Sequence, residues 1–145
     1  MVDYMKQVFL IKLSGEAMAG TLGYGHDFDY IEKICQKIKD CHDLGVGIGI
    51  VCGGGNILRG RDAHVMNREI ADYTGMLATV MNSLVLKDTF TRIGCQVYNQ
   101  TGLSVKTIDD IDSMKARKAI EDGKIVIFGG GTGKPFFSTD TGASL

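Results

Sequence analysis

Three short, mostly apolar runs in this sequence each end at a glycine-bearing turn, and this repetition constrains the fold more than any other feature. The runs are residues 8–13, 46–52 and 124–128, and glycine follows each of them directly or after one serine. Short apolar runs bounded by glycine are typical of buried strands in a parallel sheet. Longer amphipathic stretches separate the runs, so the sequence predicts alternating strands and helices.

Three of the intervening stretches have helical periodicity. We expect helices over residues 29–44, about 67–93 and about 113–122, and a further short strand near 95–98. The apolar face expected to be buried in the first helix consists of Ile31, Ile34, Cys35, Ile38 and Cys41. The stripe expected to be buried in the second consists of Ile70, Tyr73, Leu77, Val80, Met81 and Leu84. The pattern predicts one α/β domain over residues 1–145, a three-layer αβα sandwich around a mainly parallel sheet.

In such a sheet, ligands bind beyond the carboxyl ends of the strands. Glycine turns at that edge leave backbone N–H groups exposed, and these groups suit phosphate oxygens. A single loop of this kind is more often only a tight turn, but three at one edge favour a phosphate site. Neither common nucleotide motif fits, because Pro135 replaces the hydroxyl residue of a Walker A loop and Leu58 replaces the third glycine of GxGxxG.

Composition limits the classes of partner. Lys and Arg number 16 against 17 Asp and Glu, so a net charge of −1 argues against a nucleic-acid groove or a polybasic membrane anchor. The longest apolar and glycine run, residues 44–52, is too short for a membrane helix of roughly 20 residues. The four cysteines form no CxxC pair, which predicts free thiols in a cytoplasmic protein with neither zinc nor disulfides.

Four segments carry a family resemblance: KLSGEA at residues 12–17, GGGNILRG at 53–60, NR with GMLATVMN within 67–82, and TGKPFFSTD at 132–140. On these residues the chain resembles the bacterial-type UMP kinases, a branch of the amino acid kinase family, from residue 10 to residue 145. The resemblance implies transfer of the γ-phosphoryl group of ATP to UMP, which gives UDP and ADP for pyrimidine nucleotide biosynthesis. Sister branches share the lysine and the triple glycine but lack the GMLATVMN and TGKPFFSTD segments.

The resemblance also assigns roles to residues. It implies catalytic roles for Lys12, between the donor and acceptor phosphates, and for Asp140, which would orient Lys12. The residues that it implies for ATP are Lys12, Leu13, Ser14, Gly15, Gly55 and Arg59. Those implied for UMP are Gly54, Asp72, Thr132, Gly133, Lys134, Pro135, Phe136, Phe137, Ser138 and Thr139. Considered alone, Lys12, Arg59 and Asp72 could be solvated charges, and the two phenylalanines could be core residues.

Further expectations concern regulation and cofactors. A weaker correspondence links GTP activation to Gly20, Thr21, Leu22, Gly23, Tyr24 and Gly25. The resemblance further implies Mg²⁺ bound with ATP, inhibition by UTP and a homohexamer. No separate metal site is expected, because His26, His42 and His64 lack ligand spacing and are expected to face solvent. Lys134 stands where the family often has a neutral residue.

The resemblance covers roughly the first three-fifths of a UMP kinase, so the ATP-binding C-terminal part is expected to be absent. A chain ending at Leu145 is therefore expected to bind UMP weakly at best and not to turn over ATP. Two alternatives stay open at this point. The chain could be a non-catalytic nucleotide-binding fragment, or another kinase of the same family that phosphorylates a small carboxylate or phosphate.

Overall fold

The structure, a computed structural model, describes residues 7–131 and contains one five-stranded sheet in the order β1-β2-β5-β3-β4. The strands are β1 Val8–Leu13, β2 Gly47–Cys52, β3 Val97–Thr101, β4 Asp109–Asp110 and β5 Ile125–Gly129. The helices are α1 Gly15–Ala19, α2 Phe28–His42, α3 Gly60–Ala63, α4 Arg68–Arg92 and α5 Ser113–Glu121, with a 3₁₀ turn, η1, at Gly20–Leu22. All paired strands of the sheet are parallel, which confirms the predicted α/β fold.

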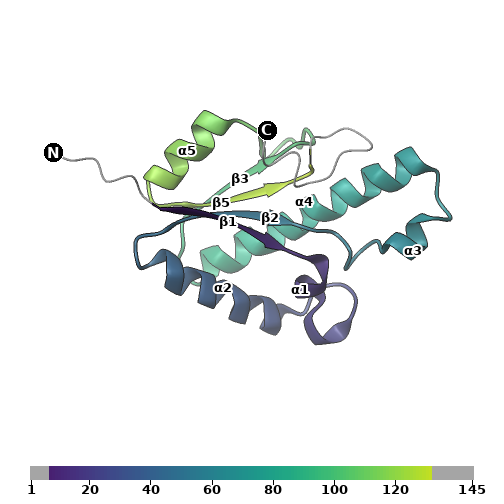
Figure 1. Ribbon diagram of the computed structural model, residues 1–145, viewed down its shortest axis with the longest axis horizontal. Helices are drawn as coiled ribbons and strands as arrows, with labels where there is room; N and C mark the ends of the chain where they lie inside the picture. The colour runs from purple at the N-terminus through teal and green to yellow at the C-terminus, as the bar shows by residue number, and fades with distance from the viewer. Residues whose placement is uncertain (1–6, 132–145) are drawn as a thin grey trace.

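Helices cover both faces of the sheet. Figure 1 shows α5 on one face and α2 with α4 on the other. The main core lies between the sheet and these two helices, where Phe90, Leu86 and Ile31 are almost completely buried against Ile50 and Ile127. β1 is an edge strand of the described sheet, and its first three residues are exposed.

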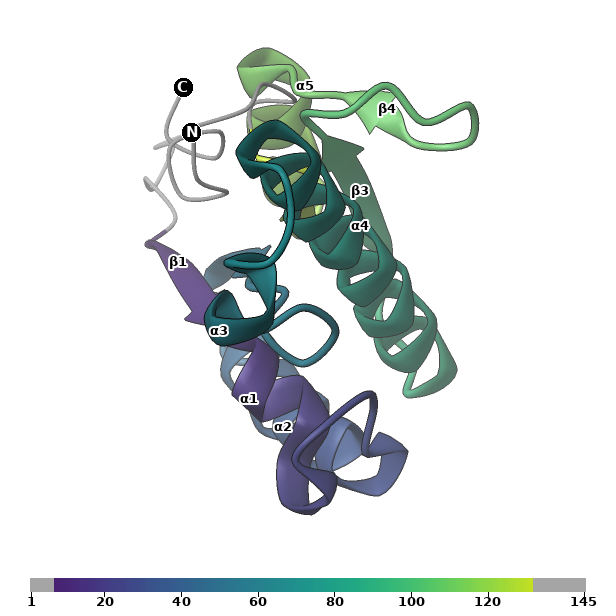
Figure 2. The same ribbon diagram turned by 90° about the vertical axis from the view of Figure 1, so that its right-hand side faces the viewer.

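The register of the strands brings three glycine turns to one edge. Leu13 pairs with Cys52, and Val51 pairs with Phe128, so β1, β2 and β5 end level with one another. The residues that follow these strands therefore leave the sheet side by side, as the sequence predicts for a ligand-binding edge. Figure 2 shows α1 and α3, which follow two of these turns, on the side of the molecule that faces the viewer.

The structure supports most of the expected buried face of α2. Ile31, Cys35 and Ile38 are buried, but Cys41 is exposed, so the prediction was wrong at that residue. Cys41 lies in the last turn, one residue before the helix ends at His42. All four cysteines are free thiols, as expected, and burial raises the pKa of Cys35 and Cys52 to about 12.

The buried face of α4 is not the one that the sequence suggested. Of the six expected core residues only Val80 is buried, whereas Ile70, Tyr73, Leu77, Met81 and Leu84 are 40–57% exposed. Besides Val80, the buried face consists of the large apolar residues Met76, Leu86 and Phe90 and of the small and polar residues Ala71, Ala78, Thr79, Asn82, Ser83 and Thr89. Their hydroxyls bond to backbone carbonyls of α4 itself, as Thr79 Oγ1 does to Met76 O at 2.6 Å. Apolar periodicity alone therefore selected the wrong side of the helix.

Several short elements were not predicted, namely α1, η1, α3 and β4. β3 also begins two residues later than the expected strand, at Val97. These elements are shorter than the windows over which hydrophobic periodicity can be recognised. None of the helices within residues 7–131 combines the length and apolarity needed to cross a bilayer.

Candidate phosphate-binding site

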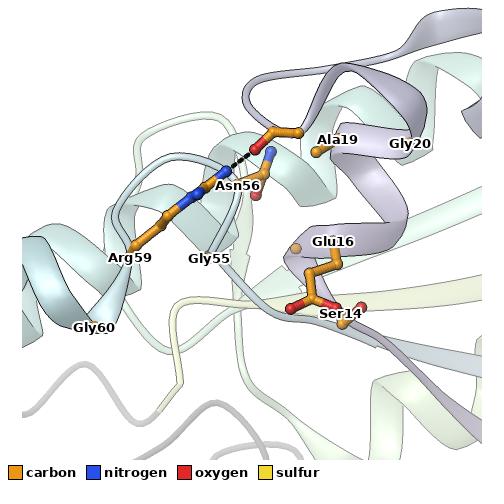
Figure 3. A pocket seen from close by; sticks show the side chains of 10 residues that line it. Ser14, Glu16, Ala19, Gly20, Gly55, Asn56, Arg59 and Gly60 are labelled. Atoms are coloured by element: carbon orange, nitrogen blue, oxygen red, sulfur yellow. Dashed lines mark hydrogen bonds between the residues drawn. The ribbon is translucent and has the colours of Figure 1, made fainter.

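A cavity of about 580 Å³ opens at the carboxyl edge of the sheet, between α1 and the loop that follows β2 (Figure 3). Its walls come from the start of α1, from the turn after α1, from the loop after β2 and from the start of α3. The lining residues are Ser14, Gly15, Glu16, Ala19, Gly20, Gly23, Gly55, Asn56, Arg59 and Gly60. Most of them are glycine or small, so backbone rather than side chains forms much of the surface.

Glycine is required at residue 15 because the backbone of the turn after β1 there lies directly against the backbone of the turn after β2. A Cβ at Gly15 would lie 2.4 Å from the amide nitrogen of Gly55 and 2.5 Å from that of Asn56. A Cβ at Gly53 would in turn lie 3.1 Å from the amide nitrogen of Gly15. The turns after β1 and β2 thus pack backbone against backbone, which only residues without side chains permit.

The next glycine of the loop packs against α4. A Cβ at Gly54 would lie 2.9 Å from Ala78 Cβ and 3.1 Å from Gly75 O. Gly55, by contrast, is exposed and has open space where its Cβ would be. Gly54 therefore faces α4, whereas Gly55 faces the cavity.

The loop presents donors that the rest of the described chain does not use. Within residues 7–131, no hydrogen bond is donated by the backbone amides of Gly54, Gly55 or Asn56. The loop is instead tied through its oxygens, since Gly54 O accepts from Ile57 N at 3.0 Å and from Leu58 N at 3.2 Å. Consecutive unpaired amides in a turn form a concave surface that binds anions.

Two charged side chains lie at the cavity, one of each sign. The guanidinium of Arg59 donates a hydrogen bond to Gly23 O and so reaches across from the glycine loop to the segment before α2 (Figure 3). Glu16 lies in the first turn of α1, whose N-cap Ser14 accepts a hydrogen bond at Oγ from Ala17 N at 3.3 Å. Arg59 can contribute positive charge to an anion in the cavity, and Glu16 limits how negative that anion can be near α1.

The segment between α1 and α2 is held by Asp27. Its carboxylate accepts hydrogen bonds from Tyr30 N at the start of α2 and from Thr21 N and Oγ1. These bonds, the one from Tyr30 N first, lower the pKa of Asp27 below its ordinary value. One ionised side chain therefore caps α2 and fixes the turn that contributes Gly20 and Gly23 to the cavity.

The structure gathers part of the predicted site. Of the residues expected to bind ATP, Ser14, Gly15, Gly55 and Arg59 line the cavity. Lys12 and Leu13 lie just before it, at the end of β1, and Lys12 is exposed. Of the segment assigned to GTP, Gly20 and Gly23 line the same cavity.

Two of the predicted UMP residues lie within the described chain, Gly54 in the glycine loop and Asp72 on α4. Asp72 is partly exposed on α4, with its Oδ2 3.8 Å from Arg68 Nε. It precedes Gly75 by three residues, so both lie near one face of α4, and Gly75 contacts Gly54. The remaining UMP residues, Thr132 to Thr139, and the catalytic candidate Asp140 lie outside the described residues.

Sequence reasoning missed three residues. Asn56 and Glu16 line the cavity, and the position of Asn56 directly after the triple glycine was the signal available for it. His26 was expected to face solvent, but it is partly buried, with Nε2 2.7 Å from Asn82 Oδ1. Within residues 7–131, no cluster of three or more His, Cys, Asp or Glu side chains could hold a metal ion.

The close approach at Gly15 gives a first prediction. Gly15→Ala should lower the free energy of unfolding by about 1–3 kcal/mol, because its Cβ overlaps backbone that cannot rotate away. Gly75→Ala is the matched control, since its Cβ meets nothing within 4 Å and alanine favours a helix, so stability should stay equal or rise by up to about 1 kcal/mol. Urea titrations of both variants measure the difference, and equal midpoints would contradict the packing described above.

Comparison with known proteins places this geometry in a family. The sequence profile of the amino acid kinase family matches residues 7–145. The UMP kinase of Bacillus anthracis is 39% identical with a TM-score of 0.85, over 93% of this chain and 57% of that one. The UMP kinase of Ureaplasma parvum is 32% identical with a TM-score of 0.87, over 97% of this chain and 63% of that one.

A third structure shows how widely the fold is shared. The isopentenyl phosphate kinase of T. acidophilum, solved as a product complex, is 13% identical with a TM-score of 0.61, over 85% of this chain and 54% of that one. At that identity the likeness concerns the fold alone. The chain spans about three-fifths of the length of the two UMP kinases. Since the family profile covers nearly the whole sequence, the chain belongs to the amino acid kinase family.

Proposed function

We propose that this chain is the acceptor-binding part of a phosphotransferase that moves the γ-phosphoryl group of ATP to UMP. The observation that carries the proposal is the set of consecutive amides at Gly54, Gly55 and Asn56, none of which donates a hydrogen bond within residues 7–131, and of which Gly55 and Asn56 line the cavity at the strand ends. Two UMP kinases at 32–39% identity support UMP as acceptor. The GMLATVMN segment, which carries the resemblance to that branch, forms the part of α4 against which Gly54 packs.

The glycine loop gives the proposed reaction its geometry. Residues assigned to ATP lie on the cavity side of the loop, and Asp72, assigned to UMP, lies on α4 beyond Gly54. The phosphate groups of ATP and UMP would then meet at the loop, with the loop amides between them. Phosphoryl transfer needs in-line positioning and compensation of charge more than covalent chemistry.

Lys12 would supply compact positive charge at the point of transfer. It lies at the carboxyl end of β1, two residues before Ser14 in the cavity wall. The acceptor phosphate is ionised at neutral pH, so no strong general base is required. Asp140 would then orient Lys12 rather than remove a proton.

Magnesium fits this arrangement only as a companion of ATP. Among the described residues, Glu16 is the one carboxylate in the cavity wall, and no cluster of three acidic or histidine ligands occurs. Mg²⁺ commonly binds through substrate phosphates and one or two carboxylates, and there it neutralises phosphate charge.

The chain matches only part of the length of the two UMP kinases, and this favours a second candidate function for the isolated chain. It spans 57–63% of the two UMP kinases, so part of what those enzymes use is not represented here. The 145-residue chain could then bind a nucleotide without turning it over. Activity is therefore best assayed in two forms: the chain alone, and the chain joined to the part of the Bacillus anthracis enzyme that follows the matched region.

The function is tested by ADP release with UMP as acceptor. Aspartate and glutamate are the comparison acceptors for a kinase that phosphorylates a carboxylate, and CMP tests whether the base of the nucleotide is recognised. We expect turnover only in the joined form and only with UMP.

In the joined form, Lys12→Met should lower kcat by about 100-fold with little change in UMP affinity, because the charge acts on the transferring group. An unchanged kcat would remove Lys12 from the mechanism, and a preference for another acceptor would reject UMP.

A second kinetic prediction concerns the acceptor. Asp72→Asn keeps the shape of the side chain but removes its charge, so a hydrogen bond to a ribose hydroxyl would weaken. We expect KM for UMP to rise about tenfold and KM for ATP to stay unchanged. The matched control is Asp88→Asn on the same helix, an exposed carboxylate paired with Arg92, which should change neither constant. If KM rose for ATP and not for UMP, Asp72 would belong to the ATP site and not to the UMP site.

We also propose that the chain assembles as a homo-oligomer through the exposed stripe on α4. Five large apolar side chains at spacings of three and four residues lie along one face of this helix: Ile70, Tyr73, Leu77, Met81 and Leu84. A continuous apolar face of this size on a soluble chain marks an interaction surface. GTP activation, UTP inhibition and a hexamer stay part of this proposal on the resemblance alone.

The assembly can be tested by a charge at the centre of the stripe. Leu77→Glu should shift sedimentation velocity toward the monomer at micromolar concentration, because burying an unpaired carboxylate is costly. Leu22→Glu, at another exposed leucine in the turn after α1, is the control and should leave the distribution unchanged. Identical distributions for unmodified chain and Leu77→Glu would exclude this face as an interface.

A further inference from the structure

Three polar side chains from separate segments meet beneath the glycine loop. Asn56 comes from the loop itself, Asn82 from the middle of α4, and His26 from the segment that precedes α2. Asn56 and Asn82 are 1% and 0% exposed. Amides buried this deeply are tolerated only when they are hydrogen-bonded, so their partners decide what the cluster does.

The two amides use nearly their whole hydrogen-bonding capacity. Asn82 Nδ2 donates to Gly53 O and to Asn56 Oδ1, both at 2.7 Å. Asn56 Nδ2 donates to Gly25 O at 2.9 Å and to Asn82 Oδ1 at 3.1 Å. The side chains thus form a reciprocal pair, and each amide also holds one backbone carbonyl. The two carbonyls belong to the glycine loop and to the segment before α2.

These bonds also determine the role of His26. The carbonyls of Gly53 and Gly25 only accept, so the Nδ2 atoms must point toward them and Asn82 Oδ1 must be the acceptor toward His26. His26 Nε2, 2.7 Å from that oxygen, must therefore carry a hydrogen and donate it. The histidine completes the cluster as a donor.

The same two segments are joined by backbone as well. Gly25 N donates to Asn56 O at 2.9 Å, so Gly25 and Asn56 exchange hydrogen bonds in both directions. Arg59 adds a further link through Gly23 O. Through these contacts the loop that presents the phosphate-binding amides is held to α4 on one side and to the segment before α2 on the other.

We propose that Asn56, Asn82 and His26 are positioning residues that hold the amides of Gly54, Gly55 and Asn56 in the orientation needed for phosphate. This inference rests on the proposed function, in which the cavity binds the phosphate groups of the substrates. Donors that are fixed before the ligand arrives need no reorganisation when charge develops, and a displacement of about 1 Å can cost on the order of 100-fold in rate. Asn82 acts through Gly53 O, and His26 acts through Asn82.

Another buried amide provides a matched control. Asn99 on β3 is 6% exposed, and its Nδ2 donates to Ser83 Oγ at 3.3 Å on the same helix as Asn82. Within residues 7–131, Asn99 forms no hydrogen bond with the glycine loop. Asn99→Leu and Asn82→Leu therefore each replace a buried amide by an apolar side chain, one beside α4 and one on it. Only Asn82→Leu removes hydrogen bonds to the glycine loop.

The experiment measures amide hydrogen exchange by NMR together with binding of inorganic tripolyphosphate by calorimetry, both on the 145-residue chain. Tripolyphosphate carries a phosphate chain without a base, so it reports on the loop alone. Asn82→Leu should speed exchange at the amides of Gly25 and Ile57 at least about tenfold, since their acceptors belong to the loop. Tripolyphosphate affinity should fall about tenfold in the same variant. Asn99→Leu should change neither quantity.

A second pair of variants covers the case in which Asn82→Leu does not fold. His26 is only partly buried, so substitution there leaves the main core intact. His26→Leu removes the donor and should show the same two effects, whereas His26→Gln keeps an N–H at a similar reach and should restore both. A merely space-filling role would not distinguish glutamine from leucine.

The outcomes separate this inference from the proposed function. Unchanged exchange at Gly25 and Ile57 in Asn82→Leu or His26→Leu overturns the positioning role. Faster exchange with unchanged tripolyphosphate affinity overturns it too, because the loop would then not need this cluster to bind phosphate. No tripolyphosphate binding by the unmodified chain rejects the proposed phosphate site and with it the inference. Normal binding without turnover in the joined form rejects only the kinase reaction.

Discussion

The contact between Gly15 and the loop after β2 is the constraint on which the rest of the structure depends. A Cβ at this residue would lie within 2.5 Å of two backbone nitrogens, so the first turns after β1 and β2 touch with no side chain between them. That contact sets the position of α1, and α1 with the loop defines the cavity. The same loop packs through Gly54 on α4, so the edge of the sheet is closed on both sides by direct backbone approach. A phosphate site made from amides needs this arrangement, because amides have no flexible stem with which to adjust.

The sequence was sufficient for the parts that rest on strong local signals. The apolar runs ending in glycine predicted β1, β2 and β5, and their parallel pairing brings the three turns together as expected. Asn67 caps α4 through Oδ1, and Asp112 caps α5 in the same way, so both helices begin where the polarity of the sequence changes. The strand order, with β5 inserted between β2 and β3, was not predictable from periodicity because it depends on how the whole chain packs.

The error on α4 has a physical source in the close approach between the middle of this helix and the ends of the strands. Gly129 at the end of β5 would place a Cβ 3.1 Å from Thr79 O and 3.2 Å from Val80 Cα, so strand and helix approach too closely for large side chains. Gly130 N then donates to Thr79 Oγ1 at 2.7 Å, which ties the third glycine turn to the same helix. Small and polar residues lie where this approach occurs, because they leave room for the backbone and form hydrogen bonds with the loops. His26 was misjudged for the same reason, since its partner Asn82 was assigned to no buried face.

The inner face of α4 contacts β3 and β5 and the turns after β2 and β5, and it buries Met76, Leu86 and Phe90 besides its small and polar residues. Five other large apolar residues form the exposed stripe on the opposite side of the helix. A second copy bound to that stripe would contact the same helix that contains Thr79 and packs against Gly54. Burying Leu77 and Met81 in an interface would restrict tilting of α4, and tilting is the motion that would separate Gly54 from Ala78 and Asn82 from Gly53. Assembly and phosphate binding would then stabilise one conformation of one helix, so each would favour the other by ordinary linkage.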